Sequence, residues 1–170
     1  MSKPTFRAAA LALAGILIAI GGCTENPSAA TGYQFVRRSA SQARFDGSGS
    51  SSSSVIDARG GTIVTPLGDQ LVFPAGAVSQ PTTITLRSET DYLGVVVEPH
   101  GLQFPAGRQP VLTLKAGGAN VAGLRGLALG YVNEVGSLES VFWVRAGNET
   151  VSAQLPHFST YRVIFTATGS

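Results

Sequence analysis

The chain has 170 residues, a length typical of one domain with short attachments. Hydrophobic residues make up 44% and charged residues 13%, which excludes a disordered polymer, and a single cysteine excludes an internal disulfide and a multi-cysteine zinc site. Twelve basic residues face ten acidic ones, and the two counts become equal once Lys3 and Arg7 are removed with the expected signal peptide, so no nucleic-acid partner is expected.

Residues 1–22 have the pattern of a bacterial signal peptide. Lys3 and Arg7 form a short positive region before an uncharged apolar run, Ala8 to Ile20, of 13 residues. A helix needs about 20 apolar residues to cross the hydrocarbon core of a bilayer, so this run is too short for a membrane span. It fits the apolar region of an export signal.

The apolar run ends in Ile20-Gly21-Gly22-Cys23, which resembles the lipobox of bacterial lipoproteins. The resemblance implies that Cys23 becomes the acylated N-terminus and anchors the chain through two or three fatty acyl chains, palmitate among them. Each buried methylene contributes about 0.8 kcal/mol, so several chains hold firmly. Thr24 after the cysteine resembles the default outer-membrane sorting pattern, which implies a periplasmic or surface position. Ordinary cleavage after Ser28-Ala29-Ala30 is the alternative.

Residues 23–54 are expected to form the lipidated end and a flexible tether. The segment is polar and ends in a glycine- and serine-rich stretch, residues 46–54, whose composition is typical of linkers. We expect proteases to cut within this tether, near Arg37, Arg38 or Arg44. Its larger side chains are expected to be solvated, with contact to anionic lipid headgroups or an external partner as the alternative; these are Tyr33, Phe35, Arg37, Arg38, Arg44 and Phe45.

Residues 55–166 are predicted to fold as an all-β, antiparallel β-sandwich of about ten short strands. Turn signals recur every 8–12 residues and several runs alternate apolar and polar residues, as in strands that bury one face. The only helical candidate, Val121 to Ala128, is weakened by two glycines. The expected strands are 60–64, 69–73, 82–86, 94–98, 102–104, 111–115, 127–133, 140–144, 150–155 and 160–165.

Three clusters in this part of the chain resemble the ZU-five domain of netrin receptors, ankyrins and zonula-occludens proteins, in the form found in bacterial surface lipoproteins. The first runs from Gly60-Gly61-Thr62-Ile63-Val64 through residues 71–78 to 81–86, the second covers 97–104 and 110–114, and the third is Leu155 to Tyr161. The family's domains serve as protein-interaction or interdomain docking modules. The resemblance therefore implies a binding function.

One tripeptide in the third cluster, His157-Phe158-Ser159, resembles the self-cleavage site of some related domains. By that resemblance Ser159 is the nucleophile, His157 is the base, and the bond between Phe158 and Ser159 is cut after an N-to-O acyl shift. The alternative, which we expect, is a turn into the last strand with Phe158 in the core and the chain intact.

Other motifs of catalysis are absent from the sequence, which has no Gly-x-Ser-x-Gly, phosphate-binding loop or His-Glu-x-x-His. We therefore expect no enzymatic activity, no metal and no cofactor. The expected function is a membrane-anchored surface lipoprotein whose β-sandwich binds another protein or an envelope polymer. Two alternatives remain, a self-cleaving domain and a carbohydrate-binding or adhesive module, for which the aromatic candidates are Tyr92, Tyr131 and Trp143.

Overall fold

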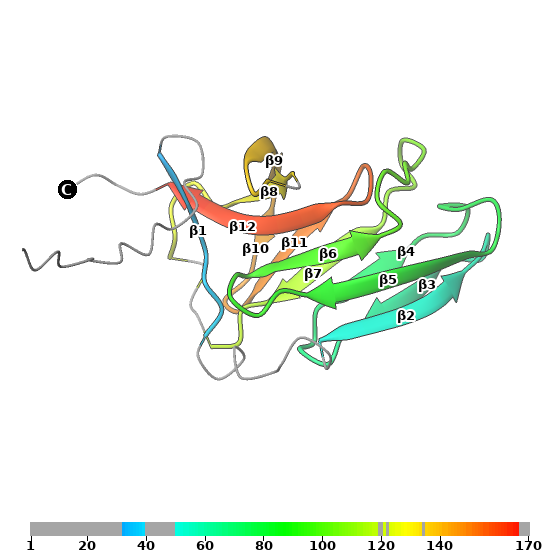
Figure 1. Cartoon of the computed structure of the whole chain (residues 1–170), viewed down its shortest axis with the longest axis horizontal. Helices are drawn as coiled ribbons and strands as arrows, with labels where there is room; N and C mark the ends of the chain where they lie inside the picture. The colour runs from blue at the N-terminus through cyan, green and yellow to red at the C-terminus, as the bar shows by residue number, and fades with distance from the viewer. Residues whose placement is uncertain (1–31, 40–49, 119–120, 122, 134, 167–170) are drawn as a thin grey trace, which may run out of the picture.

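The computed structural model of the chain describes residues 32–39, 50–118, 121, 123–133 and 135–166 (Figure 1). Two antiparallel sheets lie face to face with the apolar core between them, which confirms the predicted all-β sandwich. In these described ranges, no helix is long and apolar enough to cross a membrane. Cys23, the predicted lipidation site, lies outside them.

The described residues form twelve strands, two more than the sequence predicted. In chain order they are β1 (Tyr33–Phe35), β2 (Ser51–Ile56), β3 (Gly61–Val64), β4 (Gln70–Phe73), β5 (Thr82–Ser88), β6 (Gly94–Glu98), β7 (Val111–Lys115), β8 (Ala128–Val132), β9 (Leu138–Trp143), β10 (Arg145–Ala146), β11 (Thr150–Gln154) and β12 (Thr160–Thr166).

The larger sheet is arranged around β12. Its strand order is β2-β5-β6-β12-β8-β9, and β1 pairs with the second half of β12. The first half of β12, residues 160–162, pairs with β6, whereas Ile164 and its neighbours pair with β1. Strands β6 and β1 therefore follow one another along the same edge of β12, with β8 on the other edge.

The smaller sheet has the order β10-β11-β7-β4-β3 and lies behind the larger one in Figure 1. The chain crosses between the sheets at a tight corner, where Asp57 and Gly60 bridge β2 to β3. In the core, the rings of Phe73, Phe104 and Phe158 meet edge to face with centroids 4.8 to 6.3 Å apart. Aromatic pairs favour this geometry, and it links the two sheets at one end.

The predicted strand bounds agree best with the structure where apolar and polar residues alternate or where a run is wholly apolar. Strands β6 and β7 have the predicted bounds. The predicted strand 102–104 is reduced to a single bridge between Gln103 and His157. No helix occurs in the described part of 121–128, where turns precede β8.

The expected tether is wrong for residues 32–39 and 50–54, because both segments belong to the sandwich. Tyr33–Phe35 forms β1, and the serine run forms most of β2, in register with β5 from Ser51 opposite Arg87 to Ile56 opposite Thr82. A strand at the sheet edge needs only one partner, so hydroxyl side chains suffice on its exposed face. The expected domain start at residue 55 therefore moves to Tyr33 or before.

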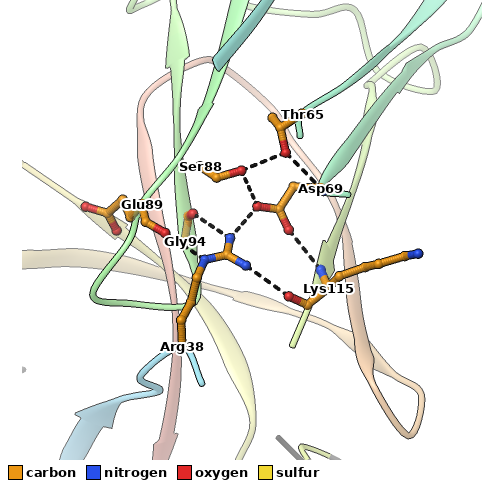
Figure 2. A network of polar contacts seen from close by, with 7 residues as sticks. All are labelled: Arg38, Thr65, Asp69, Ser88, Glu89, Gly94 and Lys115. Atoms are coloured by element: carbon orange, nitrogen blue, oxygen red, sulfur yellow. Dashed lines mark hydrogen bonds and ion pairs between the residues drawn. The ribbon is translucent and has the colours of Figure 1, made fainter. Parts of the chain in front are cut away.

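Arg38, expected to be solvated and open to proteases, is fully buried in the structure (Figure 2). Its guanidinium pairs with the carboxylate of Asp69, whose side chain is also fully buried. The remaining donors reach backbone carbonyls: Nε donates to Glu89 at 2.6 Å, Nη1 to Lys115 at 2.9 Å and Nη2 to Gly94 at 3.3 Å. The pair is thus held by both sheets at once.

Asp69 is satisfied by further donors besides Arg38 (Figure 2). The Ser88 hydroxyl donates to Oδ2 at 2.5 Å, and the Lys115 backbone N–H donates to Oδ1 at 2.9 Å. Thr65 accepts from the Asp69 N–H and shares a hydrogen bond with Ser88. Buried charges need such complete pairing, since an ion left alone in the interior costs several kcal/mol.

We predict that Arg38→Met lowers the free energy of unfolding by about 3–5 kcal/mol, because it leaves the Asp69 carboxylate buried without its counter-charge. Urea unfolding followed by circular dichroism measures the change. The matched control is Arg59→Gln at the exposed Asp57–Arg59 pair, which should leave the unfolding midpoint near that of the unmodified chain. Equal midpoints for the two variants would contradict the role of the buried pair.

Candidate functional site

The tripeptide His157-Phe158-Ser159 lies in an extended ladder that leads into β12. The Phe158 N–H donates to the Leu102 carbonyl at 2.9 Å, and the Gly101 N–H donates to the Phe158 carbonyl at 2.9 Å. The Phe158 ring is 1% exposed and packs in the core. The sequence prediction of a core phenylalanine at the entry to the last strand is confirmed.

Tyr161 ties the entry of β12 to the residue four positions before it. Its hydroxyl donates to the His157 carbonyl at 2.7 Å and lies 3.2 Å from Nδ1 of the same residue. A phenol has one proton, so Nδ1 must be the donor in the second contact. Burial, with a smaller contribution from Tyr131, raises the pKa of Tyr161, which keeps its hydroxyl a donor. The arrangement resembles the tyrosine corner of β-sandwiches.

Cleavage at Phe158–Ser159 needs a donor for the oxyanion, a base on the Ser159 hydroxyl and a strained peptide at the bond. The geometry meets the first of these conditions. The Gly101 N–H already contacts the carbonyl that would become the oxyanion. However, the His157 Nδ1 is engaged by Tyr161, and among the described residues no hydrogen bond joins Ser159 to the His157 ring. No non-glycine residue in the described ranges has the left-handed backbone that would store strain at the bond. The arrangement suits a structural corner.

A groove of about 510 Å³ begins beside this corner and runs across the outer face of the larger sheet. Its floor is a lateral row of four residues from four neighbouring strands. Arg87 of β5 lies opposite Val96 of β6, which lies opposite Thr160 of β12, which lies opposite Val132 of β8. Val96 and Val132 face away from the core yet are buried, so the walls of the groove rise above them.

One wall of the groove is an ion pair, Glu89 with Arg162, joined by two hydrogen bonds of 2.7 Å. The hydrogen bonds to Glu89 raise the pKa of Arg162, so the guanidinium stays charged. Gly94 makes the pair possible, since a Cβ at that position would lie 2.5 Å from the Glu89 carboxylate. The Arg162 guanidinium also stacks on Phe35 and Tyr92, with ring centroids 5.3 and 4.6 Å away.

The other predicted candidates are not gathered into one aromatic platform. Tyr92 lies between the guanidinium groups of Arg37 and Arg162, and Tyr131 meets the His157 ring edge to face at 5.1 Å. The Trp143 side chain and Cys23 lie outside what the structure describes. In the described ranges, no group of three His, Cys, Asp or Glu side chains forms a metal site.

Arg87, Arg162 and Glu89 were not singled out by the sequence. Arg87 alternates with the buried Leu86 and Ser88, and Arg162 with the buried Tyr161 and Val163. This alternation predicts that the two arginines share the outer side of the sheet. It does not say that only β6 separates their strands, so the groove could be recognised only from the fold.

Comparison with known proteins adds no assignment to this geometry. No protein-family model and no curated protein matches the chain. The resemblance to the ZU-five domain stays a prediction.

We predict that Tyr161→Phe lowers the free energy of unfolding by about 1–3 kcal/mol, because it leaves the His157 carbonyl and Nδ1 without their partner. Urea unfolding measures the loss, and Ser159→Ala, which removes a hydroxyl outside this contact, is the control. Denaturing mass spectrometry should find all three chains uncut. A released 12-residue piece, Ser159 to Ser170, that disappears in Ser159→Ala would overturn the structural role of the tripeptide.

Proposed function

We propose that the chain is a lipid-anchored protein of the bacterial envelope whose β-sandwich, of the ZU-five type, binds another macromolecule through the groove. In this proposal the protein is a binding protein and not an enzyme. The proposal combines the lipobox-like sequence at Cys23 with the position of strand β12, which runs from the N-terminal segment to the groove. That geometry is the observation on which the proposal depends.

Strand β12 joins the anchored end of the fold to the groove. Its last residue, Thr166, pairs with Tyr33 at the start of β1, and its first residue, Thr160, lies in the groove floor. Six residue steps separate the two ends, which is about 20 Å of extended strand. An anchor at Cys23 is therefore attached at one end of β12, while the groove opens at the other end.

The distance to the membrane also follows from the corrected domain start. Ten residue steps lead from Cys23 to Tyr33, and they span at most about 35 Å. The anchored domain therefore stays close to the membrane surface. Such a protein presents its groove to a partner within the envelope or at its surface.

The role of the tripeptide supports a binding rather than a catalytic function. The titratable side chains of the corner, His157 and Tyr161, bind one another. The polar groups that line the groove come from strands and from the loops that adjoin them, and among the described residues no hydrogen bond joins His157 to Ser159. This arrangement suits recognition.

We predict that Cys23→Ser moves the protein from the membrane fraction to the soluble fraction or leaves an unprocessed precursor, because the thioether cannot form. Detergent phase partitioning and N-terminal mass analysis provide the readout. Ser28→Ala, in the alternative cleavage region, is the control and should still partition with the detergent. An unmodified chain that is soluble, with an N-terminus other than Cys23, would contradict the anchor.

We predict that a photo-crosslinking residue at His100, on the rim of the groove, forms an adduct with a macromolecule in cells. The control position is Thr62, which is exposed on β3 of the opposite sheet. Both variants keep the groove floor intact, and gel mobility reports the adduct. Adducts at both positions, or at neither, would contradict the assignment of the groove as the binding surface.

A further inference from the structure

Among the described residues, the groove has one arginine, Arg87, without a hydrogen-bonded or ion-paired partner, and it lies at one end of the floor. Arg87 is exposed, and within the described residues its guanidinium forms no hydrogen bond and no ion pair. The nearest acidic residue on the neighbouring strand, Glu98, lies two residue pairs further along, opposite Thr85 on the same face of the sheet, and does not line the groove. The free guanidinium is a donor that suits carboxylate or phosphate oxygens.

The other arginine of the groove and the Asn133 amide already have partners. Arg162 is neutralised by Glu89 through two hydrogen bonds. The Asn133 amide donates to Glu139, and its oxygen accepts from the backbone of Val135 and Ser137. Among the described residues, Arg87 is therefore the arginine of the groove left to recognise an anion, while the Glu89–Arg162 pair lies in the row next to the floor.

Hydroxyl groups and ring faces complete the groove. Within the described structure the side chains of Ser159 and Thr160 make no hydrogen bond; Thr160 is half-buried and open to a ligand, whereas Ser159 is buried at the edge of the groove. His157 uses Nδ1 on Tyr161, which leaves Nε2. A cation at one end of the floor, the Thr160 hydroxyl within it, Ser159 beside it and half-buried rings at the other end match a hydroxylated ring that bears an oxyanion.

Since the proposed function assigns macromolecular binding to this groove, the inference rests on it and specifies the ligand. We infer that the groove binds an anionic sugar unit, with the carboxylate or phosphate group at Arg87 and the sugar hydroxyls along Ser159 and Thr160. A volume of about 510 Å³ lies within the range of small-ligand sites. The carboxylated and the phosphorylated sugar share one chemical feature, an oxyanion on a sugar ring.

The test is a titration of the purified full chain, followed by amide NMR, with three sugars that differ at one carbon. Glucuronate bears a carboxylate, glucose 6-phosphate bears a phosphate, and glucose bears neither. We expect saturable shifts at the Val96 and Thr160 amides with at least one anionic sugar and none with glucose. The sugar that binds identifies the source of the oxyanion, and raising the salt concentration should weaken its binding.

Arg87→Gln should weaken this binding about tenfold or more, because it removes the charge-assisted hydrogen bonds. The matched control is Arg108→Gln, which changes an exposed arginine outside the groove and should bind like the unmodified chain. Unfolding midpoints of both variants, measured alongside, show whether each is folded.

Three results would overturn the inference: equal binding by Arg87→Gln and the unmodified chain, equal shifts with glucose, or no shift with either anionic sugar. The crosslinking experiment separates this failure from a failure of the proposed function. An adduct at the His100 position without anionic-sugar binding would reject the ligand chemistry alone.

Discussion

The sandwich is centred on one buried ion pair, Arg38 with Asp69, because it joins the N-terminal segment to both sheets. Asp69 precedes β4 of the smaller sheet, and the guanidinium reaches carbonyls at the start of β6 and at the end of β7. Desolvating two charges is costly, and only complete hydrogen bonding offsets that cost. The pair therefore adds little stability by its presence, yet together with the pairing of β1 and β12 it positions the N-terminal segment against both sheets.

The same pair explains why the sequence misled the interpretation of residues 32–39. Composition is an average, and an arginine among serines and glycines has the composition of a solvated linker. Whether such an arginine is buried depends on an aspartate 31 positions away, which no local pattern reveals. The serine run was missed for a related reason, since β2 is an edge strand whose pairing with β5 needs backbone groups and no apolar pattern. Strands such as β7, with alternating buried and exposed residues, were predicted with their correct bounds.

The candidate site shows a different limit of sequence reasoning. The order His157-Phe158-Ser159 fits a base and nucleophile, and equally fits a corner with its phenylalanine in the core. Tyr161 distinguishes these interpretations, because its hydroxyl binds both the carbonyl and Nδ1 of His157. The tyrosine was visible in the sequence two residues after the serine, but its inward direction depends on the register of β12 against β8, where it lies opposite Tyr131.

Because β12 alternates between the two sides of the sheet, one strand determines both the core and the groove. Tyr161 and Val163 point inward and are fully buried, which fixes the strand; Thr160 and Arg162 then have to point outward. The groove floor is set by backbone ladders on both edges of this strand, and Arg162 is further held by Glu89. A ligand in this groove would meet side chains that are already ordered, apart from Arg87. Little ordering entropy is then lost on the protein side, and the affinity depends mainly on how well the ligand satisfies that single free guanidinium.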